Sequence, residues 1–283
     1  MDTQEIMYTA LNLAGMDYIP ADTAVHVDGK DIRKVLMCID VEQSTLLLAK
    51  QLGCDAVIAH HPIGIASINF HRVLDRHIEF MLSAGIDRSV AEEAVKELKT
   101  RVELRAHTSI YTHVTSYARV LNMPLLNIHL PCDEVMRREV VAALNSSRID
   151  KVKDILVRVE EIREFKNADT RVKVVHGSED ATVGKYMVVI AAGTNGGYSV
   201  AKAYFENGYD TVIYLHISPE DLARIRSENL NGNLVILGHL AGDSLGMNRL
   251  ADALVRKGLE VVKLGIIEEK RIEEKRIKYR SEQ

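Results

Sequence analysis

The sequence predicts an α/β fold with mostly parallel strands, and three features of the chain lead to this prediction. Residues 35–39 and 57–59 are short apolar runs, which are typical of strands covered on both faces of a sheet. Residues 45–52 between them form a predicted helix that ends at Gly53. Strand, helix and strand make a βαβ unit, whose strands pair in parallel through a right-handed crossover. Residues 187–192 begin a similar unit, because this apolar run leads through a glycine loop into another predicted helix.

The rest of the chain continues this alternation of apolar runs and amphipathic segments. Helices are expected over residues 4–15, 117–121, 136–144, 199–206, 219–225 and 245–255, and over most of 64–105 with a break near Gly85. Strands are expected over residues 102–106, 125–128, 171–175, 187–192, 211–215, 234–237 and 261–265, with 171–175 at an edge of the sheet in a hairpin-like excursion. Residues 268–283 alternate acidic and basic side chains, which predicts a solvated helical or frayed tail.

Composition narrows the class of protein. A chain of 283 residues can form one large domain or two, and 47% hydrophobic with 27% charged residues is ordinary for a soluble globular protein. A net charge of −4, four phenylalanines and no tryptophan argue against nucleic-acid binding, which favours basic surfaces and aromatic stacking. The three cysteines have no Cys-x-x-Cys spacing, so neither a disulfide framework nor a zinc knuckle is expected.

Targeting signals are not expected either. The first residues carry neither a basic nor an apolar signal-peptide region, and no run approaches the roughly 18 apolar residues of a membrane span. We therefore expect a cytoplasmic protein without membrane partners.

The run of residues 57–59 ends in His60-His61-Pro62. Open α/β sheets place their chemistry at the carboxyl ends of strands. Adjacent residues at a strand end point in different directions, so the two rings could reach separate positions around a metal. On its own, the pair fits equally well with loop histidines that bind backbone groups.

Other predicted strands end in the same way. Histidines stand at five such ends: His60 and His61, His107, His129, His216 and His239. An aspartate follows four residues later in two cases, Asp133 after His129 and Asp243 after His239. Imidazole with carboxylate suits one or two divalent ions of zinc, iron, manganese or nickel rather than calcium or magnesium. Such an ion could make a water acidic enough to act as a nucleophile near neutral pH.

The loop after residues 187–192 carries Gly193, Gly196 and Gly197. A strand, a glycine loop and a helix aim backbone amides and a helix N-terminus at an anion, so these glycines are candidates for binding a cofactor or substrate phosphate. The loop matches neither a Walker motif nor a strict dinucleotide fingerprint. A tight turn without a ligand remains the alternative.

In these features the chain resembles the NIF-three-like family, whose members are often called GTP cyclohydrolase I type 2 homologues. The resemblance covers about residues 4–265 and rests on residues 35–41 (strand ending at Asp40), Ala59-His60-His61-Pro62, Ala106-His107-Thr108, the glycine loop, and Gly238-His239 with Asp243. It implies two similar α/β halves, here residues 1–130 with the His-His-Pro motif and 131–283 with the glycine loop and final motif. It also implies a metal site between them, usually dinuclear, and a ring-like homohexamer.

The resemblance also implies the ligands: the two histidines of His-His-Pro, an acid four residues after a later histidine, and the histidine and acid of the final motif. The chain departs from this pattern twice. Asp243 stands where the family usually has glutamate, and Tyr111 stands four residues after His107, where the family has a bridging aspartate. Either Asp133 supplies the missing acid, or this chain binds one ion or binds metal differently. We expect Asp133 near the site.

Two functions are compatible with these observations. The first is a metal-dependent hydrolase of a small nucleotide-like or phosphate-bearing substrate, in which His60, His61, His239 and Asp243 hold metal and the glycine loop or a nearby basic residue orients the anion. The alternative is a non-catalytic metal-binding or regulatory scaffold. A homo-oligomer is expected in both cases.

Overall fold

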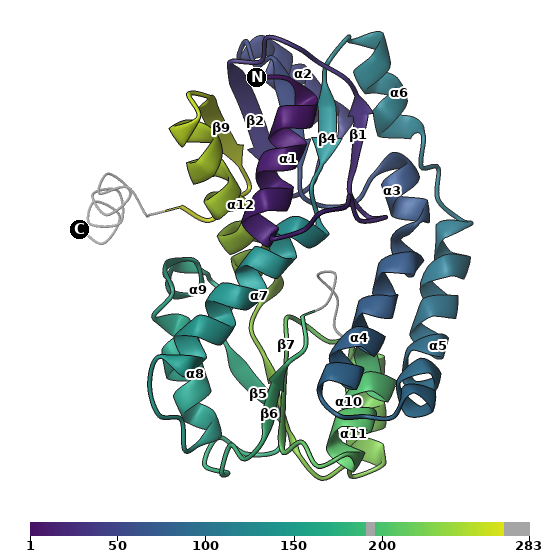
Figure 1. The fold of residues 1–283 in the computed structure, drawn as a ribbon, viewed down its shortest axis with the longest axis vertical. Helices are drawn as coiled ribbons and strands as arrows, with labels where there is room; N and C mark the ends of the chain where they lie inside the picture. Colours follow the sequence, from purple (N-terminus) through teal and green to yellow (C-terminus); the bar gives the residue numbers. More distant parts are fainter. Residues whose placement is uncertain (191–195, 269–283) are drawn as a thin grey trace, which may run out of the picture.

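The computed structural model of the chain describes residues 1–190 and 196–268, and it consists of two α/β halves (Figure 1). Helix α7 (Leu130–Asn145) runs from the first half into the second, and α12 (His239–Arg256) runs back from the second half to the first. These two helices pack against each other where the halves meet.

The first sheet has the strand order β1-β4-β3-β2-β9. Its strands are β1 (Ala24–Val27), β2 (Lys34–Cys38), β3 (Ala56–Ala59), β4 (Leu125–Asn127) and β9 (Glu260–Leu264). All neighbours are parallel except β1, which pairs antiparallel with β4 at the edge. β9 joins this sheet from the far end of the chain, while the predicted boundary between the halves at residue 130 stays a prediction.

The second sheet repeats this arrangement with the order β5-β8-β7-β6. Its strands are β5 (Lys173–His176), β6 (Tyr186–Val188), β7 (Thr211–Tyr214) and β8 (Asn233–Ile236), and only β5 is antiparallel to its neighbour. In both sheets an antiparallel edge strand lies beside the fourth strand, followed by the third and the second. The predicted α/β class with two similar, mostly parallel halves is therefore confirmed.

Helices cover both faces of the sheets. Besides α7 and α12 they are α1 (Thr3–Ala14), α2 (Gln43–Gln51), α3 (Gly64–Ile68), α4 (Asp75–Ser83), α5 (Arg88–Ala106), α6 (His113–Val120), α8 (Val152–Glu160), α9 (Arg163–Asn167), α10 (Gly197–Glu206) and α11 (Pro219–Ser227), with a 3₁₀ helix at Phe70–Leu74. Among the described residues, none of these helices is both long and apolar enough to cross a membrane.

The apolar strand runs are buried on both faces, as expected for parallel strands covered by helices. Alternate residues of β2 divide between two cores: Val35 and Met37 pack in the cluster that includes α1 and α12, whereas Leu36 and Cys38 pack in the cluster that includes α2 and α6. The three cysteines are buried and unpaired with each other, in agreement with the sequence prediction.

One predicted strand is wrong. Residues 102–106 are the last turns of the helix α5, not a strand. The alternation of apolar and charged residues there imitates a strand, but the preceding buried positions Ala91, Ala94 and Val95 follow helical spacing, and no glycine or proline interrupts the segment. Leu104 is consequently exposed. Of the other predicted segments, Ala191 and Ala192 at the end of the 187–192 strand and the tail from residue 269 lie outside the described residues.

Two glycines on α12 allow it to approach the first turns of α7. A Cβ atom on Gly246 would lie 2.8 Å from the carbonyl carbon of Cys132, and one on Gly242 would lie 3.3 Å from Cε of Met136 and still closer to the side chain of Leu215. Real Cβ atoms essentially never come within 3.0 Å of a neighbour, so the contact at Gly246 requires a residue without a side chain.

We predict that Gly246→Ala lowers the free energy of unfolding by about 1–3 kcal/mol, the usual cost of overpacking a core. The loss should appear although alanine is a better helix former than glycine by about 1 kcal/mol. Urea unfolding of wild type and variant measures the difference. Gly242→Ala is the matched control with a smaller loss, because its obstructing atoms are side-chain ends that can rotate. An equally stable Gly246→Ala protein would show that this helix contact tolerates a methyl group.

Candidate metal centre

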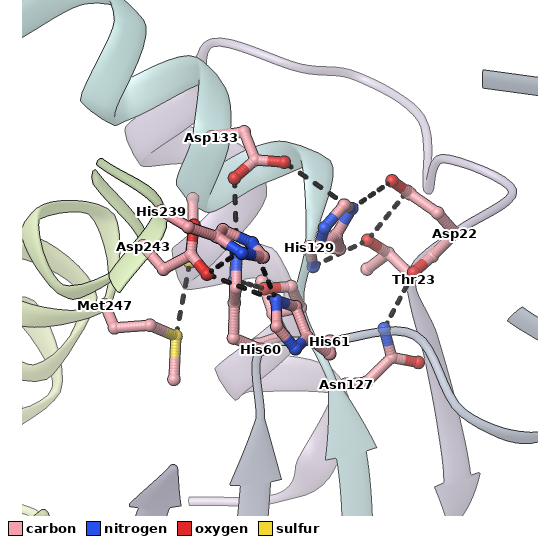
Figure 2. A network of polar contacts seen from close by, with 12 residues as sticks. Asp22, Thr23, His60, His61, Asn127, His129, Asp133, His239, Asp243 and Met247 are labelled. Atoms are coloured by element: carbon pink, nitrogen blue, oxygen red, sulfur yellow. Dashed lines mark hydrogen bonds and ion pairs between the residues drawn. The ribbon is translucent and has the colours of Figure 1, made fainter. Parts of the chain in front are cut away.

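Four histidines and two aspartates converge at the carboxyl edge of the first sheet (Figure 2). His60 and His61 follow β3, and His129 lies two residues beyond the end of β4. The first turn of α7 supplies Asp133, and α12 supplies His239 at its first position and Asp243 one turn later. Both helices begin earlier than the sequence predicted, so each His-x-x-x-Asp segment forms a helical turn. Residues four apart lie on one face of a helix, which is why each histidine and its aspartate stay together.

Hydrogen bonds fix the tautomers of three of these rings. The Nδ1 atoms face only acceptors: His60 Nδ1 lies 3.1 Å from the carbonyl oxygen of Ile128, His61 Nδ1 lies 2.7 Å from Asp40 Oδ1, and His129 Nδ1 lies 2.7 Å from Asp22 Oδ2. Carbonyl and carboxylate oxygens cannot donate, so each Nδ1 carries a proton. In the neutral ring the lone pair is then on Nε2. Metal-binding histidines are usually held by this kind of partner.

The antiparallel edge strand explains how Asp22 reaches this edge. Because β1 runs opposite to β4, the residues that precede β1 lie next to those that follow β4, and Ala24 pairs with Asn127. Asn127 donates from Nδ2 to the Asp22 carbonyl at 2.7 Å, and the His129 backbone N–H donates to Thr23 Oγ1 at 3.1 Å. The sequence analysis missed Asp22 and Thr23, since no motif links them to the histidines.

One set of ligand atoms forms a nearly equilateral triangle. His61 Nε2 lies 3.3 Å from His239 Nε2 and 3.1 Å from Asp243 Oδ2, and His239 Nε2 lies 3.2 Å from the same oxygen. Zinc bonds of about 2.0–2.1 Å in a tetrahedral site separate two ligand atoms by about 3.3–3.4 Å. The triangle therefore has the size of one face of a tetrahedral metal site.

A second set lies deeper and contains polar atoms without hydrogen bonds. His60 Nε2 lies 3.3 Å from Asp133 Oδ1 and 3.6 Å from Asp243 Oδ1, and all three side chains are buried. Among the described residues, none of these three atoms finds a hydrogen-bond partner, and neither does Asp133 Oδ2. A buried polar atom without a partner costs about 1–3 kcal/mol, and more when it is charged. A cation bound here would satisfy all of them.

Asp243 belongs to both sets, with Oδ2 toward His61 and His239 and Oδ1 toward His60. It is therefore the carboxylate that the two sets share. His60, His61 and His129 form a third group whose ligand atoms lie within 4.8 Å of one another. Asp133 lies at the centre, as expected, but on the side of His60 and His129.

The electrostatics of the centre follow from this burial. Desolvation alone would raise the pKa of the Asp243 carboxyl, but His60, His61 and His239 hold it well below its usual range. Desolvation alone would lower the pKa of His60, but Asp243 and Asp133 raise it well above its ordinary value. The two buried carboxylates, Asp133 and Asp243, are therefore stable together only with a positive charge between them, which a protonated ring or a metal cation can supply.

Two predicted site residues lie elsewhere or outside the described chain. His107 is exposed at the C-terminal end of α5 and belongs to none of the three groups, because the strand expected to deliver it is a helix. Tyr111, four residues later, is 44% exposed. Gly193 lies outside the described residues, so its role stays a prediction.

Gly196 and Gly197 begin α10. Gly197 has a φ of +64°, and a Cβ there would lie 3.0 Å from Asp221 Oδ2. The carboxylate of Asp221 thus lies close to the start of α10, and packing against it accounts for the glycine. Anion binding by this pair also stays a prediction.

A pocket of about 380 Å³ opens beside the centre. Its lining comes from the segment after β3, the end of α5 and the strand ends of both halves: His61, Pro62, Ser67, Phe70, Val102, Arg105, Ala106, Ser109, His129, His216 and His239. The His216 ring lies tilted beside that of His239, at 4.6 Å between ring centroids, but His216 belongs to none of the three groups. Three candidate ligands thus face a space large enough for a small molecule.

Comparisons with known proteins show what the chain is similar to. A family model described as Duf34/NIF3 (NGG1p interacting factor 3) matches residues 23–271. A NIF3 superfamily protein from Sphaerobacter thermophilus is similar, with 45% identity, a TM-score of 0.90, and coverage of 94% of this chain and 99% of that one.

More distant structures share the fold. Reduced HcgD from Methanocaldococcus jannaschii has 17% identity and a TM-score of 0.61, with 93% of this chain and 98% of that chain covered. The Staphylococcus aureus hypothetical protein SA1388 has 12% identity and a TM-score of 0.54, with 94% and 97% covered. None of the curated proteins compared matches the chain.

We predict that long-range ¹H–¹⁵N NMR spectra of histidine-labelled, metal-free protein show an Nδ1 proton on His60, His61 and His129. Asp22→Ala should change only His129 and shift its ring toward the Nε2–H tautomer, because the variant removes the acceptor of the His129 Nδ1–H group. Asp40→Ala is the matched control and should change only His61. An Nε2 proton on neutral His129 in the wild type would contradict the assignment.

Proposed function

The chain belongs to the DUF34/NIF3 family, and from this premise we propose that it is a metal-dependent hydrolase of a small nucleotide-like or phosphate-bearing substrate. One or two divalent ions of zinc, iron, manganese or nickel would be held where the halves meet. The observation that carries the proposal is Asp243, whose two oxygens face two separate groups of ligand atoms.

The donor set fits such ions. His61, His239 and Asp243 would hold one ion, and His60, Asp133 and Asp243 would hold a second, with His129 beside it. Neutral imidazole and carboxylate are ligands that zinc and its neighbours in the periodic table accept, whereas calcium and magnesium prefer oxygen alone. The buried atoms of His60, Asp133 and Asp243 that lack hydrogen bonds support a bound cation.

A divalent metal here supplies Lewis acidity and a water of lowered pKa. The protein contributes orientation. Asp22 and Asp40 hold two rings in the ligating tautomer, and the hydrogen bond from His61 to Asp40 makes the opposite nitrogen more basic. The pocket brings a small substrate against His61, His129 and His239, which places the reacting bond beside the centre.

One observation favours the alternative of a metal-binding or regulatory scaffold without turnover. Within the described part of the chain, the pocket lining contains no carboxylate, and His216 is its only histidine outside the three ligand groups. A hydrolase would therefore have to move protons through His216 or the ligand groups themselves. Measuring turnover separates the two functions.

We further propose a cytoplasmic homo-oligomer, a hexamer by family resemblance, which acts on a small anionic substrate without nucleic-acid or membrane partners. The three free, buried cysteines and the net charge of −4 support this environment and this choice of partner. Light scattering of the purified protein measures the oligomer.

We predict that the purified protein carries one or two transition-metal ions per chain by inductively coupled plasma mass spectrometry. Asp243→Asn should lose most of this metal, because it weakens both groups at once. The loss in affinity should exceed the roughly 10–100-fold that removing an outer partner of a ligand costs. Hydrolysis of a panel of nucleotides and phosphate esters should fall in parallel.

His216→Ala is the control for metal content and should keep the wild-type value, because His216 lies outside the ligand groups. Wild-type protein that takes up none of the four metals would exclude both functions. Metal uptake without turnover of any substrate in the panel would favour the scaffold.

A further inference from the structure

The pocket beside the centre has an uneven distribution of charge. Among the residues that the structure describes, Arg105 is the only permanently charged one in the lining, and no aspartate or glutamate of this part of the chain lines the pocket. The guanidinium is exposed near the C-terminal end of α5. A ligand that enters this pocket therefore meets one fixed positive charge in addition to the centre.

Arg105 differs from the other basic residues of its helix. The remaining four each pair with a carboxylate: Arg88 with Glu92, Lys96 with Glu93, Lys99 with Asp75, and Arg101 with Asp221. Within residues 1–190 and 196–268, the Arg105 side chain has no ion pair or hydrogen bond. Its five N–H donors are thus free to bind a ligand.

The two serines that line the pocket are unsuited to an anion. Ser67 donates its hydroxyl proton to the Gly64 carbonyl at 2.8 Å, and Ser109 donates to the Ala106 carbonyl at 2.8 Å. Both oxygens can still accept a hydrogen bond, so they suit N–H or O–H groups on a ligand.

Apolar surface completes the pocket. Pro62, Phe70, Val102 and Ala106 line it, and the Phe70 ring stands edge-on to His129 at 5.4 Å between centroids. A ring or other flat apolar body could pack there. A volume of about 380 Å³ is near the lower end of the roughly 300–1,000 Å³ of small-molecule sites.

We infer that Arg105 is the specificity-determining residue of this pocket and binds the oxyanion of a small organic substrate. The substrate class is an aromatic or heterocyclic compound with a phosphate or similar oxyanion held by Arg105. Its ring packs on Phe70 and Val102, and its reacting end faces the histidines. The inference rests on the proposed function, because that function places the chemistry at this end of the pocket.

Isothermal titration of metal-loaded protein with benzenesulfonate and phenylphosphonate tests this inference. Sulfonates coordinate metals poorly, so benzenesulfonate reports on Arg105 rather than on the centre. Arg105→Gln should weaken the binding of both anions by about tenfold or more, as expected for the loss of a charge-assisted hydrogen bond. Arg105→Lys should retain part of the affinity, because lysine keeps the charge but loses the two-pronged geometry.

Two controls accompany the titration. Arg101→Gln removes an arginine one turn earlier that does not line the pocket, and it should bind both anions as the wild type does. Methyl phenyl sulfone, a neutral analogue of benzenesulfonate, should bind wild type and Arg105→Gln equally. Metal content is measured for every protein and should be the same in all of them.

Three results would overturn the inference: equal benzenesulfonate affinity in wild type and Arg105→Gln, no binding of either anion to wild type, or loss of metal in Arg105→Gln. Failure of the proposed function has a different signature. If the wild-type protein takes up no metal, the proposed metal centre is refuted. The dependence of benzenesulfonate binding on Arg105 can still be measured in that metal-free protein.

Discussion

The way in which the two halves meet depends on the burial of two carboxylates, Asp133 and Asp243, on either side of His60. Like charges in a buried place repel strongly, and each loses its hydration, so a folded chain tolerates them only with positive charge between them. The N-terminal ends of α7 and α12 must meet to bring both carboxylates to one point. That approach depends in turn on Gly246, which leaves room for the backbone of α7. The close contact of α7 with α12 at Gly246 thus brings candidate ligands from both halves to one place.

Orientation of the rings depends on a second feature, the antiparallel edge strand. A wholly parallel first sheet would place the residues before β1 at the opposite edge, away from the histidines. Because β1 is reversed, Asp22 reaches His129 while Asp40, directly after β2, reaches His61. Both rings are held in the tautomer that a metal requires, so these two side chains would lose little further conformational entropy on binding one.

Much of this could be predicted from the sequence. The ends of parallel strands meet at one edge, so histidines after strands predict a cluster, and the spacing of four in His129/Asp133 and His239/Asp243 belongs to one helical face. Asp22 could not be predicted, because it lies far from its partner in sequence and follows no pattern. His107 was misplaced because alternating residues inside a helix imitate a strand. The early start of α7 was signalled only by Pro131 in its first turn, a position that proline favours.

The likeness of the two halves explains why the candidate ligands within residues 1–190 and 196–268 gather at one place rather than two. The first sheet has β9 as an additional edge strand, but its other four strands follow the same order as those of the second sheet. Both sheets send a His-x-x-x-Asp turn from the fourth strand into a long helix. Their third strands differ. The second residue after each strand is a histidine, His61 after β3 and His216 after β7. The first residue after each strand differs: it is His60 after β3 but Leu215 after β7, and Leu215 is buried in a hydrophobic core of the second half. The second half therefore lacks a deep ligand of its own. Its aspartate turns to the first half as the shared carboxylate, and His216 is left to line the pocket through which a substrate would reach the centre.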